Sequence, residues 1–180
     1  MQRVSVVGNS GSGKTTLARQ LAGRLGVAHV ELDAIFHQPD WQELPAADFR
    51  AALQEFVEQP GWVVDGNYST VQDIVWARAD TVIVLDLPRS LVMRRVARRT
   101  LGRLLLRREL WNGNREPWSN VLSVDPQRSI LAWAWTRHHT YQERFAQAQV
   151  DPANAHLQFL VLHSRRDVRS VVAAAGPAAT

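Results

Sequence analysis

The sequence contains no cysteine and only one lysine, Lys14; the other 20 of its 21 basic residues are arginines. Without cysteine there is no disulfide framework, no thiolate metal site and no thiol nucleophile. No run of about 18 apolar residues is present, so no membrane-spanning helix is expected. The start of the chain lacks the charged segment, apolar run and cleavage site of a signal peptide. We therefore expect a soluble, cytoplasmic protein without a membrane partner.

Short apolar runs alternate with helical patterns along the 180 residues, a length that suits one domain. The apolar runs predict strands at 3–7, 27–32, 62–65, 81–87 and 157–163. Because these runs are continuously apolar, they indicate a parallel sheet covered by helices on both faces. The segments between them predict helices at 14–25, 46–58, 70–77, 90–106, 127–148 and 167–175. Loops are expected at 34–45 and 111–126.

The segment Gly8-Asn9-Ser10-Gly11-Ser12-Gly13-Lys14-Thr15 matches the phosphate-loop pattern G-x-x-x-x-G-K-[ST] at every required position. Its glycines allow successive backbone N–H groups to turn toward a phosphate, and the helix that follows adds positive potential. We expect Lys14 to reach the β- and γ-phosphates of ATP and Thr15 to ligate Mg²⁺. The nucleotide-binding segment is expected to extend to Thr16. The single lysine of the chain lies here, which indicates a position where the bulky, forked side chain of arginine could not replace lysine.

Three acids lie at the ends of predicted strands, at the edge where parallel sheets bind ligands: Asp33, Asp65 and Asp86. For Asp86, two residues before Pro88, a helix cap is the favoured interpretation. Asp65 ends an apolar run, which is typical of the carboxylate that holds Mg²⁺ in P-loop enzymes. Asp33 is a candidate catalytic acid that would orient the hydroxyl of a phosphoryl acceptor. The alternative for Asp33 and for Asp65 is that each caps a helix or a turn.

Nine arginines and one acid, Glu109, lie between residues 89 and 115, a local net charge of +8 that leaves −4 for the rest of the chain. On a helix, pairs at i, i+4 such as Arg95 and Arg99 repel each other. The block therefore favours an anionic partner, although a solvated basic face is the alternative. In a kinase it would form a lid at about 98–126, with Arg99 catalytic. The candidate lid residues are Arg98, Arg99, Arg103, Arg107, Arg108 and Arg115.

Seven tryptophans are a high count for this length. Three lie in apolar patterns and are predicted core residues: Trp62, Trp133 and Trp135. Three lie in predicted loops, where a large ring indicates a role such as ligand stacking: Trp41, Trp111 and Trp118.

With these features the chain resembles the adenylate-kinase-like P-loop kinases, and more narrowly the bacterial group labelled DNA topology modulation proteins. The resemblance is carried by the segments VSVVGNSGSGKTTLA, HVELDAIFHQPDW, GWVVDGNYS and VIVLDLPRSLVMRRVARR. It implies one kinase-like domain over residues 1–180, with a three-layer α/β/α P-loop NTPase fold and a five-stranded parallel sheet. It also implies ATP with Mg²⁺, an acceptor-binding segment at about 34–60 and a lid that begins near Arg99.

One departure concerns the acceptor. Nucleoside monophosphate kinases carry an arginine in the acceptor segment and another after the D-G of the third strand. Here Ala34–Phe49 contains no arginine, and Asp65-Gly66 is followed by Asn67-Tyr68-Ser69. We therefore expect a hydroxyl-bearing acceptor of another kind. Its candidate binding residues are Asp33, His37, Trp41, Asn67 and Tyr68.

Two functions are compatible with the sequence. The first is a small-molecule kinase that transfers the γ-phosphoryl group of ATP to an unidentified acceptor. The alternative is a nucleotide-dependent protein that interacts with DNA through the arginine block and modulates its topology. The kinase is favoured because no DNA-reading module such as a helix-turn-helix is evident. Neither the acceptor nor the oligomeric state follows from the sequence.

Overall fold

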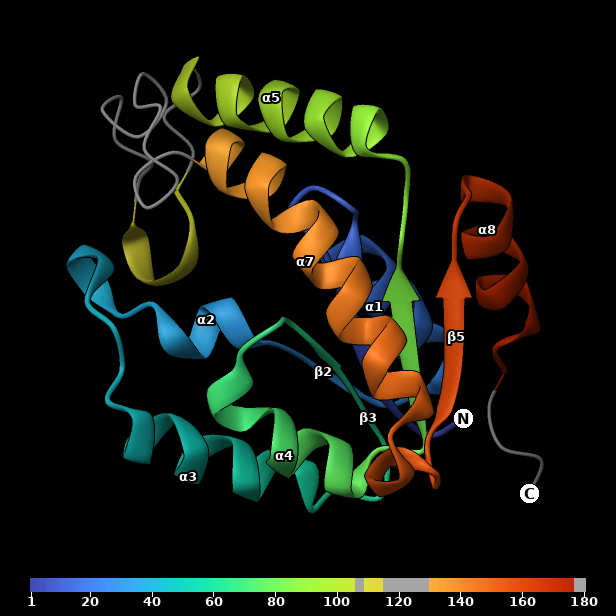
Figure 1. Ribbon diagram of the computed structural model, residues 1–180. Coiled ribbons are helices and arrows are strands. Elements are labelled where there is room, and N and C mark those ends of the chain that lie inside the picture. Colours follow the sequence, from blue (N-terminus) through green and yellow to red (C-terminus); the bar gives the residue numbers. More distant parts are fainter. Residues whose placement is uncertain (106–108, 115–129, 177–180) are drawn as a thin grey trace.

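Five parallel strands form the centre of the protein. The computed structural model describes residues 1–105, 109–114 and 130–176. The strands are β1 (Arg3–Gly8), β2 (Ala28–Glu31), β3 (Trp62–Asp65), β4 (Thr81–Leu85) and β5 (Gln158–Leu162). They pair in the order β2-β3-β1-β4-β5, and every pairing is parallel (Figure 1). The predicted fold class is therefore confirmed.

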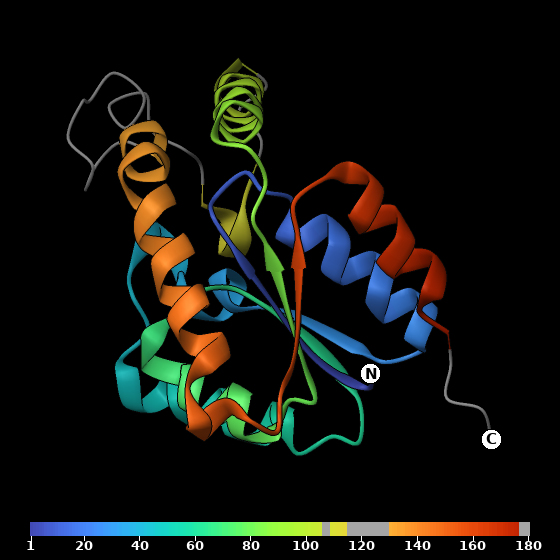
Figure 2. The ribbon, with the colours of Figure 1, turned by 45° about the vertical axis from the view of Figure 1, so that its right-hand side comes forward.

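Helices cover both faces of the sheet and complete the three layers (Figure 2). On one face lie α1 (Lys14–Leu25) and α8 (Arg165–Ala174). On the other lie α3 (Ala46–Val57), α4 (Ser69–Arg78) and α7 (Ile130–Val150). Helix α5 (Arg89–Leu105) follows β4 and lies beyond the carboxyl edge of the sheet (Figure 1). None of the helices in the described ranges is long and apolar enough to cross a membrane.

Helix α1 illustrates how the sequence produces these layers. Leu17, Leu21 and Leu25 recur at i, i+4 and i+8, and all three are buried against the sheet. Gly26 ends the helix in a left-handed conformation, with φ of 69°. The residues of β3 and β4 are all buried, as expected for strands covered on both faces.

The tryptophans predicted to lie in the core differ in burial. Trp62 is fully buried and donates its Nε1–H to the carbonyl oxygen of Val57 at 3.1 Å, so that prediction is confirmed. The prediction for Trp135 is wrong: its side chain is 53% exposed, and the Arg89 guanidinium lies 3.3 Å from its ring centroid. The physical reason is that the first turns of α7 extend past the sheet toward α5 (Figure 1). The Trp133 side chain and the whole of Trp118 lie outside the described part of the structure.

The segment predicted as a loop at 34–45 begins inside a short helix, α2 (Leu32–Phe36), and then forms one 3-10 turn, η1 (Pro39–Trp41). Leu32 is buried in the core, and the Phe36 ring lies 4.7 Å from the Tyr68 ring. Tertiary packing therefore holds this single turn of helix, which is too short to show a sequence periodicity. Two further 3-10 turns are η2 (Trp111–Gly113) and η3 (Pro152–Asn154).

The strand order decides which segments meet at the carboxyl edge of the sheet. Strand β3 lies between β2 and β1. The residues after β3, from Gly66 to Tyr68, therefore lie between Asp33 after β2 and the glycine-rich loop after β1. This is the edge at which open parallel sheets bind ligands.

Candidate nucleotide and acceptor site

The predicted phosphate loop connects β1 to α1, and all three of its glycines hold backbone conformations that other residues avoid; Gly13 has φ of 101°. Gly8 has φ of 144° and Gly11 has φ of 77°. A Cβ on Gly8 would lie 2.7 Å from the carbonyl oxygen of Leu85, and one on Gly11 would overlap the side chain of Val96. Helix α1 begins where this loop ends, and the N–H groups of its first turn have no partner within the helix. The arrangement suits a phosphate group.

Two hydroxyl side chains of the predicted nucleotide-binding segment, Ser12 and Thr16, differ in burial. Ser12 is 2% exposed, and its hydroxyl has no hydrogen-bond partner among the described residues. A buried hydroxyl without a partner is costly unless a ligand completes it. Thr16, in contrast, is exposed on the first turn of α1.

Lys14 has its Nζ 3.1 Å from the carbonyl oxygen of Asn9. Desolvation by burial lowers the pKa of Lys14 below its ordinary value, and Arg99 lowers it further, whereas Asp33 and Asp65 act in the opposite direction. The net shift is downward, so the charged ammonium group is under-compensated here. An anionic ligand would stabilise it.

Two arginines of α5 reach the phosphate loop. Arg95 donates to the carbonyl oxygen of Ser12 at 2.7 Å, and Arg99 donates to Oγ of Ser10 at 3.0 Å. Burial lowers the pKa of Arg95, and Arg165 contributes to the shift. Because they are four residues apart, both arginines lie on one face of the helix. Arg95 was not among the candidate site residues, although its i, i+4 spacing to Arg99 could have indicated it.

The remainder of the predicted lid is only partly described. Helix α5 continues to Leu105, so the first residues assigned to the lid, including the exposed Arg98, are helical. The side chain of Arg103 and the whole of Arg107, Arg108 and Arg115 lie outside the described part of the structure. The lid itself therefore stays a prediction.

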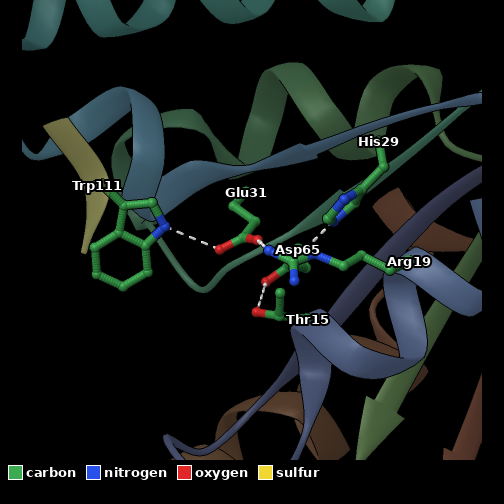
Figure 3. Close-up of polar contacts among 6 residues, drawn as sticks. All are labelled: Thr15, Arg19, His29, Glu31, Asp65 and Trp111. Atoms are coloured by element: carbon green, nitrogen blue, oxygen red, sulfur yellow. Dashed lines mark hydrogen bonds and ion pairs between the residues drawn. The ribbon is translucent and has the colours of Figure 1, made fainter. Parts of the chain in front are cut away.

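A chain of contacts runs from the phosphate loop to the edge strand β2 (Figure 3). Thr15 donates its hydroxyl to Oδ1 of Asp65 at 3.1 Å, and His29 Nε2 lies 2.7 Å from Oδ2 of the same carboxylate. Asp65 is only 4% exposed. Since both of its oxygens are engaged, Asp65 is held in one orientation beside Thr15. The role of His29 was missed, because its partner is 36 residues away.

The donor set at this point suits a hard divalent cation. A hydroxyl from Thr15 and a carboxylate from Asp65 are ligands that Mg²⁺ accepts. Ligand atoms of His29, Glu31 and Asp65 also lie within 4.8 Å of one another. Glu31, however, already forms an ion pair with Arg19 and accepts the Nε1–H of Trp111 at 2.9 Å (Figure 3).

On the acceptor side, Tyr68 connects two of the predicted residues. Its hydroxyl donates to Oδ1 of Asp33 at 2.6 Å and lies 3.4 Å from Nε2 of His37. Burial raises the pKa of Tyr68 far above its ordinary value, and the neighbouring Asp33 charge raises it further. The phenol therefore stays protonated at neutral pH and orients the Asp33 carboxylate.

A clasp, which we define as Trp111, Asn112 and Asn114, holds the acceptor segment in place. Asn114 accepts the backbone N–H of Trp41 at 2.9 Å and donates to the carbonyl oxygen of Gln38 at 2.8 Å. Asn112 donates to the carbonyl oxygens of Ala34 at 3.2 Å and of His37 at 2.5 Å.

The His37 ring contacts the rings of two tryptophans, Trp41 and Trp111. It is stacked on Trp111 at 5.9 Å between centroids and meets the Trp41 ring edge-on at 5.3 Å. Both tryptophans, expected in loops, therefore contact a predicted acceptor residue.

Asn67 differs from the other predicted acceptor residues. Its Oδ1 accepts the backbone N–H of Gly8 at 3.1 Å, and its Nδ2 donates to the carbonyl oxygen of Gly8 at 2.5 Å. Both ends of the amide are therefore occupied by the phosphate loop. In this arrangement Asn67 positions the start of the loop and does not present a free amide to an acceptor.

A family model described as "ATPase family associated with various cellular activities (AAA)" matches residues 4–105, more than half of the chain. The chain belongs to this family. It is a P-loop NTPase, as the loop geometry and the sheet order also indicate. The search of curated proteins gives no match for the sequence.

Solved structures with the fold of this P-loop NTPase share little sequence with it. Shikimate kinase from Acinetobacter baumannii, in complex with shikimate, is 17% identical with a TM-score of 0.57, covering 96% of this chain and 89% of that one. Shikimate kinase from Bacteroides thetaiotaomicron is 16% identical with a TM-score of 0.53, covering 96% and 94%. A gluconokinase from Sinorhizobium meliloti 1021 is 17% identical with a TM-score of 0.50, covering 96% and 91%. At these identities the similarity shows the fold alone.

Proposed function

We propose that this P-loop NTPase is an ATP-dependent kinase that transfers the γ-phosphoryl group to a hydroxyl of a small molecule. The observation that carries the proposal is the position of Asp33. Its carboxylate is fixed by Tyr68 and lies close enough to Lys14 to act on the pKa of that lysine. A fixed carboxylate that acts on the lysine of the phosphate loop would be able to take the proton of an acceptor hydroxyl, and this supports the proposal.

In the proposed reaction, Lys14 and the N–H groups of the phosphate loop hold the β- and γ-phosphates. Thr15 and Asp65 would hold Mg²⁺, which neutralises phosphate charge when bound. Asp33 orients the acceptor hydroxyl and takes its proton. As the acceptor oxygen bonds to the γ-phosphorus, the bond from that phosphorus to the β-phosphate oxygen breaks, giving ADP and the phosphorylated acceptor.

In the proposed reaction, two arginines of α5 would assist this transfer. Arg95 and Arg99 both reach the phosphate loop from one face of α5. Guanidinium groups at that position would stabilise the charge that develops on the transferring group. The names of the structurally similar proteins, shikimate kinase and gluconokinase, also support phosphoryl transfer to a hydroxylated small molecule.

A second candidate function keeps nucleotide binding but replaces the acceptor with DNA, as the DNA topology modulation label suggests. The observation that favours it is the exposure of Arg94 and Arg98 on α5. DNA binding through such arginines would weaken steeply as salt concentration rises, because each phosphate contact releases counterions. Kinase turnover would survive moderate salt.

The test is ADP formation measured against nucleosides, nucleotides, sugars and hydroxy acids. We expect one acceptor class to stimulate turnover, and Asp33→Asn to lower kcat by about 10²- to 10⁴-fold with ATP affinity retained. Lys14→Ala is the control that weakens ATP binding itself. If no acceptor stimulates turnover, and salt-sensitive DNA binding is lost in the Arg94→Gln/Arg98→Gln variant, the DNA-interacting alternative replaces the kinase.

A further inference from the structure

His29 lies on the edge strand β2, and the pairing of β2 with β3 decides which side chains share a face of the sheet. His29 pairs with Val63, and Glu31 pairs with Asp65. Because side chains alternate between the two faces along a strand, His29 and Asp65 lie on the same face as Val63. Val63 packs in the core cluster formed with α1 and α8. The His29 ring therefore faces the layer that carries Thr15 at the start of α1 (Figure 3).

The hydrogen bond between His29 and Asp65 has a fixed direction. A carboxylate oxygen accepts hydrogen bonds and does not donate them, so the Nε2 atom of His29, 2.7 Å from Oδ2, carries the proton. A protonated Nε2 has no lone pair to offer to a metal ion. In this arrangement His29 therefore acts on the site through Asp65 and is not itself a metal ligand.

The orientation of the Asp65 carboxylate depends on its two partners. Asp65 is buried, and a buried carboxylate needs hydrogen-bond donors in place of water. Thr15 donates to Oδ1 at 3.1 Å, and His29 donates to Oδ2. The terminal torsion of an aspartate side chain has a broad energy minimum. A carboxylate held at Oδ1 alone could therefore rotate.

The Thr15 hydroxyl depends on the same orientation. Its proton is donated to Asp65, which leaves the lone pairs of the hydroxyl oxygen for Mg²⁺ in the proposed site. If the carboxylate rotated away, the hydroxyl would lose its acceptor and could turn these lone pairs elsewhere. The contact from His29 therefore orients both of the proposed metal ligands.

We propose that His29 is a positioning residue of the metal site: by fixing the Asp65 carboxylate, it sets the affinity of the nucleotide-bound protein for Mg²⁺. Side chains that orient metal ligands in this way typically change metal affinity by about 10- to 100-fold. The inference rests on the role that the proposed function gives to Thr15 and Asp65 as Mg²⁺ ligands. It does not depend on the acceptor or on phosphoryl transfer.

The experiment measures the binding of a non-hydrolysable ATP analogue, once as its Mg²⁺ complex and once without metal in the presence of a chelator. The ratio of the two dissociation constants isolates the contribution of the metal site. In His29→Leu, which removes the donor, we expect the dissociation constant of the Mg²⁺ complex to rise about 10- to 100-fold. The dissociation constant of the metal-free analogue should stay unchanged, because Lys14 and the N–H groups of the phosphate loop do not need the metal to bind phosphate.

Further variants separate positioning from a structural role. His29→Gln places an amide N–H donor near the position of Nε2 and should restore most of the metal-dependent affinity. The matched control is His156→Leu, which removes a hydrogen bond of 3.0 Å from Nε2 to the carbonyl oxygen of Trp76 and should change neither dissociation constant. If His29→Leu does not fold, His29→Asn replaces it, because the shorter amide side chain would not reach Asp65.

Four results would overturn the inference. Two concern affinity in the folded variant: an unchanged metal dependence in His29→Leu, or equal losses for the two forms of the analogue, which would show a merely structural role. The third is a wild-type protein that binds the analogue equally well with and without Mg²⁺. The fourth is spectroscopic, with Mn²⁺ in place of Mg²⁺: an imidazole nitrogen coupling in the electron spin echo of the wild type that is lost in His29→Gln would make His29 a ligand. A metal dependence set by His29, in a protein whose turnover no acceptor stimulates, would instead support the inference and contradict the kinase.

Discussion

The two sides of the candidate site differ in what holds them: the turn of the phosphate loop has hydrogen bonds within the loop itself, whereas the acceptor side is held by contacts between distant segments. In the loop, the Lys14 ammonium group and the backbone N–H of Ser12 both bond to the carbonyl oxygen of Asn9, at 3.1 and 3.2 Å. These partners are at most five residues apart. The turn of the loop therefore depends mainly on one short stretch of sequence, although Asn67, Arg95 and Arg99 add contacts from distant segments.

The acceptor side depends on partners brought together by the fold. Tyr68 reaches Asp33 across 35 residues, and Asn114 reaches Trp41 across 73. No local conformation determines these contacts. A single added Cβ should therefore damage the phosphate loop most, whereas loss of a side-chain hydrogen bond should open the acceptor side without affecting nucleotide binding.

The largest effect is expected for Gly8→Ala. The new Cβ would meet the carbonyl oxygen of Leu85 at 2.7 Å, and alanine is strained at φ of 144°. We expect a loss of about 2–4 kcal/mol in the free energy of unfolding, together with loss of nucleotide binding. Chemical denaturation and titration with an ATP analogue measure the two effects.

The matched control for this variant is Gly23→Ala, in the middle of α1, where a Cβ has nothing within 4 Å. That change should stabilise the protein by about 0.5–1 kcal/mol and leave nucleotide affinity unchanged. If Gly8→Ala bound the analogue as tightly as Gly23→Ala, the phosphate loop would not depend on its backbone conformation, and the contrast between the two sides would disappear.

The difference between local contacts and contacts across the fold also explains which features could be predicted from the sequence. The phosphate loop, the strands and the fold class were predictable because each depends on consecutive residues or on a periodic pattern. Asp33 and Asp65 were placed at the correct edge for the same reason, since each lies at the end of a strand. Their roles in the reaction stay predictions.

The sequence could not show which side chains contact each other between segments that are distant along the chain. His29 is unremarkable in sequence until the fold brings it 2.7 Å from the Asp65 carboxylate. Arg144 lies 72 residues from Gln72, its hydrogen-bond partner. The exposure of Trp135 was also missed, because the apolar pattern of α7 continues past the point where the sheet ends. Each of these depends on tertiary contacts that no local pattern contains.

Asn67 connects the two sides, and its replacement should have an intermediate effect. Asn67→Ala removes both amide contacts to the backbone of Gly8. We expect unfolding to become easier by about 1–3 kcal/mol. The dissociation constant of the ATP analogue should rise about ten-fold, because the loop must then be ordered by the ligand.

The control for this variant is Asn154→Ala. Asn154 lies in η3, and its side chain donates a hydrogen bond of 2.9 Å to the carbonyl oxygen of Ala148 in α7, which the change removes. It should lower stability without changing nucleotide affinity. Equal affinities in the Asn67→Ala and Asn154→Ala variants would show that Asn67 does not position the phosphate loop.

The smallest global effect is expected at the clasp. Asn114 is 4% exposed, and its side chain bonds to the backbone of Trp41 and Gln38. In Asn114→Ala the acceptor segment should open locally, because these two bonds join it to a segment that is distant in sequence. Hydrogen exchange at the Trp41 amide should become about ten-fold faster for each ~1.4 kcal/mol lost, while the midpoint of global unfolding changes little.

The exposed Asn112 offers a comparison within the same clasp, since it also donates to backbone carbonyl oxygens but not to Trp41. Asn112→Ala should leave exchange at the Trp41 amide closer to that of the wild type than Asn114→Ala does. Nucleotide affinity should stay unchanged in both variants, because the phosphate loop contacts neither residue. If Asn114→Ala weakened nucleotide binding as much as Asn67→Ala, the acceptor side and the phosphate loop would form one cooperative unit, and the division drawn between them would be wrong.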